Sequence, residues 1–179
     1  NGNEDEPPHG RGVQQVDVVA DVVERKIKEL AATIRLESFN LAPLANGMPL
    51  RGIRKVNRSL RHIDAWISSV GAGVALADID GSGLPDELCL VDPRNDTVSV
   101  RPVPQKRSGE PFEPFAIAAP TTGYVAETIA PMGCLPSDVN EDGRMDLVVY
   151  YWGRTPVVFL RNMEPRLSAA AFTAVEITA

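Results

Sequence analysis

Two short acidic segments are the part of this sequence whose residue types and spacing could do chemistry. The first is DIDGSGLPD, residues 78–86, and the second is DVNEDGRMD, residues 138–146. In both segments, side chains with oxygen atoms stand at the first, third, fifth and ninth positions, and glycine stands at the sixth. Calcium takes six to eight oxygen ligands and is held by tight loops with this alternating pattern. The spacing therefore predicts two calcium-binding loops.

The predicted ligands are the same in kind for both loops. In the second loop they are the side chains of Asp138, Asn140, Asp142 and Asp146 and the backbone carbonyl of Arg144. In the first loop they are the side chains of Asp78, Asp80, Ser82 and Asp86 and the backbone carbonyl of Leu84. Because a hydroxyl at Ser82 replaces the carboxylate of Asp142, we expect the second loop to be the stronger site.

The EF-hand is the obvious competing assignment for these loops. It requires a bidentate glutamate at the twelfth position and flanking helices. The twelfth positions here are Cys89 and Val149, and both lie in strand-like runs. The loops are therefore not EF-hands. A second alternative stays open, because acidic, glycine-rich loops are also ordinary turns held by side-chain hydrogen bonds without a metal.

Two cysteines and two asparagines are further residues that could be covalently modified. Cys89 and Cys134 match neither a metal-ligand spacing nor a C-x-x-C redox motif. They form one disulfide if the chain is exported, or they are two small buried apolar residues, and the sequence leaves both readings open. Asn57 and Asn95 begin N-x-S/T sequons and would be glycan acceptors in a eukaryotic secreted protein.

Composition divides the chain into three regions. Residues 1–15 are rich in acidic residues, proline and glycine, and they predict a flexible tail. Residues 16–65 predict a helical extension: apolar residues recur at helical spacing over 17–36, with Asp17 as the N-cap, and again in a basic stretch over 50–67. The basic stretch could contact an anionic surface, but a solvated helix face is the simpler interpretation.

Residues 66–179 have the pattern of a mainly β, antiparallel domain. Short apolar runs are separated by glycine, proline, asparagine and aspartate, with no helical periodicity. The predicted strands are 74–77, 88–91, 97–103, 112–118, 147–152, 157–160 and 172–177. The acidic positions of the first loop recur 60 residues later, where Asp78 corresponds to Asp138, Asp80 to Asn140 and Asp86 to Asp146. A predicted strand hairpin follows each of the two loops. This period is typical of a β-propeller or a related array.

The segments VGAGVALADIDGSGLPDELCLV, residues 70–91, and MGCLPSDVNEDGRMDLVVYYWG, residues 132–153, resemble the FG-GAP or VCBS repeats of β-propellers, which also occur in integrin α-subunit heads. The resemblance implies that each repeat is a blade with calcium in the loop between its first two strands. It also implies a partial propeller, completed by further blades of a longer protein or of another chain or copy. Independently of the resemblance, unpaired edge strands tend to pair with other strands, which also favours further blades or another chain beside them.

The predicted function is that of a calcium-binding scaffold or adhesion-type module that binds a protein or carbohydrate ligand, secreted or at the cell surface. A formal charge of −6 disfavours nucleic acid, and no apolar run approaches the ~20 residues of a membrane span. We do not expect an enzyme, because His9 and His62 are the only histidines and no nucleophile elbow is present. The alternatives are a structural subunit whose helix docks onto a partner, or the non-catalytic propeller portion of a secreted hydrolase.

Overall fold

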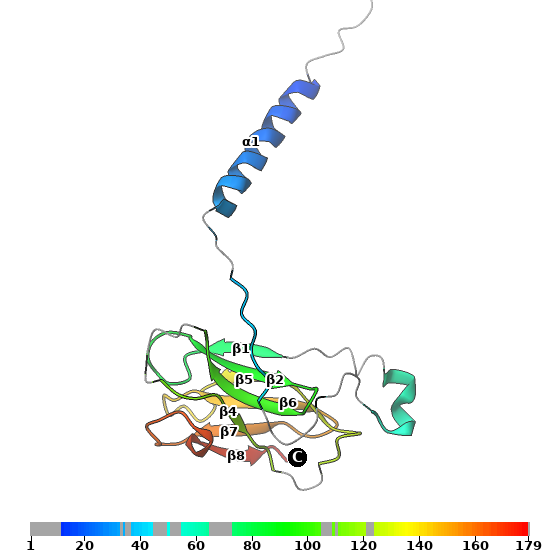
Figure 1. Cartoon of the computed structure of the whole chain (residues 1–179), viewed down its shortest axis with the longest axis vertical. Helices are drawn as coiled ribbons and strands as arrows, with labels where there is room; N and C mark the ends of the chain where they lie inside the picture. Colours follow the sequence, from blue (N-terminus) through cyan, green and yellow to red (C-terminus); the bar gives the residue numbers. More distant parts are fainter. Residues whose placement is uncertain are drawn as a thin grey trace, which may run out of the picture. The chain divides into compact units, whose positions relative to one another are not determined.

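The computed structural model describes residues 12–32, 34, 37–44, 50, 55–64, 73–104, 109, 111–120 and 124–178, with side chains from residue 22 onward. The chain forms two compact units, Asn1–Asn40 and Leu41–Ala179 (Figure 1). Among the described residues, the first unit contains one helix and the second contains the β-strands. The first strand begins at Val74, inside the region 66–179 that the sequence assigns to the β domain, and the division into three regions stays a prediction.

Helix α1 spans Gly12–Ala32 (Figure 1). The helix prediction is confirmed, but its start and its cap are wrong, because Asp17 lies inside the helix and not at its beginning. Residues 12–15, predicted as part of a flexible tail, are helical. The helix also ends before the predicted residue 36. On its exposed side, Lys28 pairs with Glu24 at 2.7 Å, a surface contact of little energetic weight.

Two antiparallel four-stranded sheets make up the β region (Figure 1). The first has the order β1 (Val74–Ala77), β2 (Glu87–Asp92), β3 (Thr97–Pro102), β4 (Phe115–Ile117). The second has the order β5 (Ala130–Ser137), β6 (Asp146–Trp152), β7 (Val157–Arg161), β8 (Phe172–Glu176). The prediction of a mainly β, antiparallel domain is confirmed, while the sheets do not close into a ring.

Strand β5 is the element that the sequence did not predict. It contains Pro131, Gly133 and Pro136, residues that usually interrupt strands, and its pairing with β6 shifts register between Pro131 and Gly133. It is nevertheless compatible with a strand because β5 lies at the edge of its sheet, where a missing N–H leaves no central ladder bond unmade. The register shift absorbs the local irregularity.

The hydrophobic core lies between the two sheets. Val91 and Val100 of the first sheet and Leu147, Val149 and Phe159 of the second are at most 2% exposed, and all belong to one cluster. These side chains come from alternate positions of each strand, as a half-buried sheet requires. The two sheets therefore share one core in place of two separate ones.

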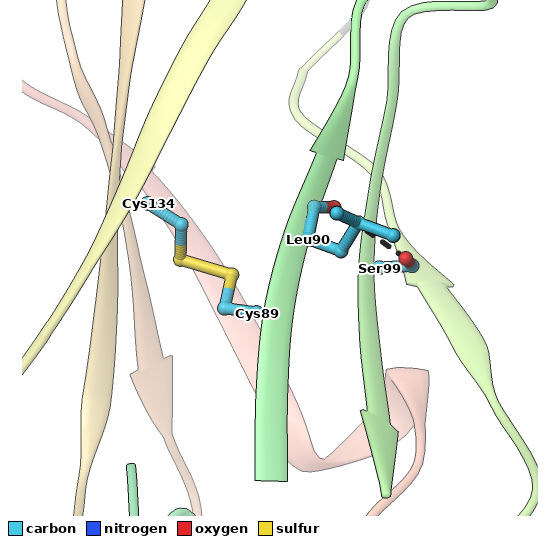
Figure 2. Close-up of a disulfide and its surroundings, with 4 residues drawn as sticks. All are labelled: Cys89, Leu90, Ser99 and Cys134. Atoms are coloured by element: carbon cyan, nitrogen blue, oxygen red, sulfur yellow. Dashed lines mark hydrogen bonds between the residues drawn. A yellow bond between two sulfur atoms is a disulfide. The ribbon is translucent and has the colours of Figure 1, made fainter. Parts of the chain in front are cut away.

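A disulfide between Cys89 of β2 and Cys134 of β5 joins the two sheets across this core (Figure 2). The two Cα atoms are 6.1 Å apart and Cys89 is fully buried. In Figure 2, Leu90 lies on the other side of β2, where its carbonyl accepts a 3.4 Å hydrogen bond from Ser99 Oγ. Of the two readings that the sequence left open for the cysteines, the disulfide is the one realised.

Residues 51–54 and 65–67 of the basic stretch predicted as a helix over 50–67 lie outside the described residues. Its described part forms a short 3-10 helix, η1 (Arg58–Ile63), which Asn57 caps by accepting a 3.0 Å hydrogen bond from the Ser59 N–H. A second 3-10 turn, η2 (Ala169–Ala171), precedes β8. Among the helices of the described residues, none combines the length and the apolar character that crossing a bilayer would need.

Candidate metal centre

The two acidic loops lie at corresponding ends of the two sheets. The first joins β1 to β2 and the second joins β5 to β6. Residues of both loops line one hollow of about 240 Å³, among them Asp78, Asp80 and Asp138, together with Arg144 and Arg161. The fold therefore brings two segments 60 residues apart in sequence to one place on the molecular surface.

In the first loop, the carboxylate of Asp78 organises the turn. Its Oδ1 accepts a 2.8 Å hydrogen bond from the Ser82 N–H and its Oδ2 accepts one of 2.8 Å from the Gly83 N–H. Asp80 Oδ1 also accepts from the Ser82 N–H, at 3.0 Å. Gly83 has a φ of +91°, which side-chain-bearing residues rarely adopt, so glycine is required at this position.

Glu87, the first residue of β2, completes a group of carboxylates that the sequence did not predict. Its side chain is fully buried, and Oε2 accepts a 2.7 Å hydrogen bond from the Ile79 N–H. One oxygen each from Asp78, Asp80 and Glu87 can be chosen so that all three lie within 4.8 Å of one another. Three carboxylates at this separation repel one another, and a hard cation between them would relieve that repulsion.

The predicted ninth-position ligand of the first loop, Asp86, lies just before this strand and is 9% exposed. Its N–H donates to the Leu84 carbonyl at 2.9 Å, and its own carbonyl accepts from the Val103 N–H at 2.9 Å. Among the described residues, the group of three close carboxylates contains Glu87 and not Asp86. The Leu84 carbonyl, predicted as a ligand, already accepts this backbone hydrogen bond.

Strand pairing explains why Asp86 and Asp146 are not equivalent. Ala77 pairs with Glu87 in the first sheet, whereas Ser137 pairs with Asp146 in the second. The first loop is therefore one residue longer between its paired strands. An offset of 60 residues matches the acidic positions by letter but misses this difference. The signal that could have identified Glu87 was an acidic residue directly before the apolar run 88–91.

The second loop makes the same turn with the equivalent atoms. Asp138 Oδ1 accepts a 3.0 Å hydrogen bond from the Asp142 N–H, and Oδ2 accepts one of 2.9 Å from the Gly143 N–H. Asn140 Oδ1 accepts from the Asp142 N–H at 3.2 Å. These are the contacts that Asp78 and Asp80 make in the first loop, so the two loops share one local geometry.

Asp142, the fifth-position carboxylate, is held by an arginine. Arg144 Nη2 lies 2.5 Å from Asp142 Oδ2, which also accepts a 2.9 Å hydrogen bond from the Asn140 amide. Desolvation raises the pKa of Asp142, but the hydrogen bonds from Arg144 and Asn140 and the Arg144 charge outweigh it, so this pKa lies below its usual value. Arg144, predicted to contribute only its carbonyl, thus supplies a cation that competes with a metal.

Asp146 is fully buried and fastens the second loop to its sheet. Its Oδ2 accepts a 2.9 Å hydrogen bond from the Val139 N–H, and its Oδ1 accepts one of 2.7 Å from the Arg161 N–H. Both oxygens are therefore engaged with backbone groups. The sequence ranked the second loop above the first, but the more compact group of carboxylates lies in the first.

Arg161 places a fixed positive charge beside both loops. It is 7% exposed, donates from Nη1 to the Asn162 carbonyl at 3.2 Å, and has its guanidinium 5.7 Å from the centre of the Phe172 ring. Burial lowers the pKa of Arg161 and so does the charge of Arg144, whereas Glu164 and Asp80 act in the opposite direction. The hollow between the loops thus has a mixed electrostatic character, with carboxylates and guanidinium groups on its walls.

A second hollow of about 300 Å³ lies at the opposite end of the first sheet. It is lined by residues 95–98 of the β2–β3 turn, by residues 116–120, and by Tyr124 and Tyr151. Burial raises the pKa of Tyr151 to about 12, so its phenol is neutral at physiological pH. Sequence reasoning gave no signal for this hollow, because alanine and proline form much of its wall.

The asparagines of the two N-x-S/T sequons differ in their exposure to solvent. Asn57 is exposed at the start of η1. Asn95 is only 2% exposed, and its Nδ2, the atom a glycan would modify, donates a 3.2 Å hydrogen bond to the Leu44 carbonyl. In the folded chain the amide of Asn95 is buried and hydrogen-bonded, whereas that of Asn57 is exposed, and a glycan at either position stays a prediction.

Comparison of the chain with models of protein families, with curated proteins and with solved structures finds no match. The resemblance to FG-GAP or VCBS repeats stays a prediction that rests on residues 70–91 and 132–153.

Proposed function

We propose that this chain is a calcium-stabilised binding module built of propeller-type blades, that it acts outside the cell, and that it is not an enzyme. The observation that carries the proposal is the carboxylate group of Asp78, Asp80 and Glu87, whose oxygens lie within 4.8 Å of one another. A calcium ion there would tie the β1–β2 loop to the first residue of β2. Its role is to fix the loop, and the ligand is a protein or carbohydrate held by the loops that the blades carry.

Two further features support this proposal. The Cys89–Cys134 disulfide suits an oxidising compartment, where calcium is also present at millimolar concentration. In the second loop, the oxygens of Asp138 and Asp146 accept backbone hydrogen bonds, which suits a structural role better than proton transfer. Calcium binding at the second loop would require Arg144 to leave Asp142, so we place the primary site in the first loop.

Thermal unfolding with and without calcium tests the proposal. Extracellular modules bind calcium with dissociation constants of ~0.1–1 mM, so 5 mM calcium should stabilise the fold by about 1–2 kcal/mol. This corresponds to a rise of a few degrees in the melting temperature compared with excess chelator. Identical melting curves in the two conditions would contradict calcium binding.

A matched pair of variants locates the site. Glu87→Gln keeps an oxygen that can accept from the Ile79 N–H but removes the charge, so we expect it to abolish the calcium-dependent rise. Asp86→Asn removes the neighbouring charge outside the carboxylate group, so we expect the rise to remain. If Asp86→Asn abolishes the calcium-dependent rise and Glu87→Gln does not, then Asp86 is a calcium ligand and Glu87 is not. Magnesium, which demands a tighter octahedral shell, serves as the ion control.

A further inference from the structure

Helix α1 carries a heptad pattern in its sequence. One set of apolar residues recurs every seven positions at Val13, Ala20 and Ile27, and a second set does so at Val16, Val23 and Leu30. The alternating spacings of three and four residues place both sets along one stripe, at the a and d positions of a coiled coil. The pattern runs through nearly the whole helix, from its second residue to Leu30.

The described part of this stripe is exposed. Val23 is 51% exposed, and Ile27 and Leu30 are each 60% exposed. The helix belongs to the compact unit Asn1–Asn40, and the strands of both sheets belong to the unit Leu41–Ala179. Most of the stability of helices in proteins comes from packing of an apolar face, so a stripe this exposed calls for a partner surface.

We propose that a second copy of this chain covers the stripe, so that two α1 helices form a parallel two-stranded coiled coil. β-Branched residues at a combined with leucine at d favour two strands over three or four, and Ile27 and Leu30 provide that combination. A second copy offers the same heptad register by definition. No further assumption about the ligand of the sheets is needed, because the proposal rests on α1 alone.

The charges beside the stripe select the parallel orientation. Asp17 and Glu24 occupy e positions, and Lys26 occupies a g position. In a parallel pair, each g residue lies near the e residue five positions further along the partner, so Lys26 lies near Ala31 and Val19 lies near Glu24. A fully overlapping antiparallel pair would instead place Asp17 near the Glu24 of its partner, twice, and like charges there would oppose association.

Sedimentation equilibrium of the full chain tests the proposal with neighbouring valines. Val23→Asp places a charge at a d position, and we expect it to raise the dimer dissociation constant by at least about 30-fold, because a buried unpaired carboxylate costs several kcal/mol. Val22→Asp makes the same substitution at the adjacent c position, which faces away from the seam and is 49% exposed, and we expect it to leave the dimer intact. Both variants change helix propensity equally.

Three outcomes would overturn the proposal. The first is a monomeric wild-type chain up to about 200 µM, since this would leave α1 to its own chain or to another protein. The second is an equal effect of the two substitutions, which would point to general loss of helix. The third is a dimer without excimer emission from pyrene attached at the first residue of α1, position 12, because only the parallel pair brings both helix starts together.

Discussion

Among single residues, the ion pair of Glu176 and Arg154 gives the clearest pH dependence. Arg154 Nη2 lies 2.8 Å from Glu176 Oε2, its side chain is 7% exposed, and Thr155 Oγ1 donates to the same carboxylate at 2.8 Å. The hydrogen bond from Arg154, then that from Thr155, hold the pKa of Glu176 below its usual value of 4.5, against a smaller effect of desolvation.

This lowered pKa predicts how the stability of a Glu176→Gln variant varies with pH. Because the folded-state pKa is below the unfolded one, the stabilisation is complete above about pH 4.5 and is lost as the pH falls through the folded value. The variant should therefore be less stable than the wild type at pH 7 and approach it below pH 4. Urea unfolding across this range measures the difference.

The exposed Glu113 provides the control for that comparison. Glu113→Gln should change the free energy of unfolding little at either pH, as expected for a surface substitution away from structured contacts. A constant gap between wild type and Glu176→Gln from pH 3 to pH 7 would mean that the pair contributes through packing and not through charge.

The local features of the two acidic loops could be predicted from the sequence, whereas the contacts that depend on the fold could not. Gly83 and Gly143 form the tight turns that glycine at the sixth position predicted, because both adopt a positive φ. Asp78 and Asp138 hold these turns by accepting backbone hydrogen bonds, and their role as calcium ligands stays a prediction. Glu87 and Arg144 could not be predicted in this way. Their roles depend on strand pairing and on the path of a long side chain, and neither is written in the spacing of acidic residues.

Among the elements, the disulfide between β2 and β5 is the strongest link between the sheets. Its cysteines are separated by 45 residues, for which loss of chain entropy in the unfolded state predicts about 4 kcal/mol of stabilisation. The double variant Cys89→Ala/Cys134→Ala should lose roughly that amount in urea unfolding. A reductant should lower the midpoint of the wild type and leave the double variant unchanged; an unchanged wild type would mean that the bridge adds no net stability.

Prediction of elements succeeded where the pattern was local. Short apolar runs located β2, β3, β6 and β7 to within a residue or so, because each of these strands supplies apolar side chains to the core. Strand β5 was missed because its prolines and glycine resemble a loop, and only its place at the edge of the sheet makes them acceptable. The start of α1 was missed because Asp17 resembled a cap but lies one turn and more inside the helix.

For the whole molecule, the segment before the sheets sets the smallest unit expected to fold well. Arg101 of β3 is 6% exposed, and its Nη1 donates a 2.6 Å hydrogen bond to the carbonyl of Ala42. Asn95 bonds to the carbonyl of Leu44 in the same segment. A fragment of residues 45–179 would remove both acceptors and leave a buried guanidinium without one of its bonds.

We therefore expect the 45–179 fragment to be less stable than the 41–179 fragment by about 1–3 kcal/mol, the cost of leaving buried donors unsatisfied. Urea unfolding of the two fragments measures this difference directly, and the full chain serves as the reference. Equal stability would show that water replaces both carbonyl groups without penalty.

The faces of the two sheets that turn away from the common core carry apolar residues too. Val74 and Leu76 of β1 are 62% and 56% exposed, and Leu135 of β5 and Tyr150 of β6 are 59% and 49% exposed. Further blades, which the resemblance to propeller repeats implies, would cover these faces. That expectation stays a prediction, because the two sheets alone neither require nor exclude a larger ring.

The disulfide also constrains how the chain reaches its native state. The sequence has two cysteines, so one intramolecular pairing exists and oxidative folding has no incorrect intrachain pairing to escape. The competing reaction is bridging between chains, whose rate rises with protein concentration while closure within one chain does not. Dilution during oxidation should therefore raise the yield of chain with the intrachain Cys89–Cys134 bridge without any isomerase.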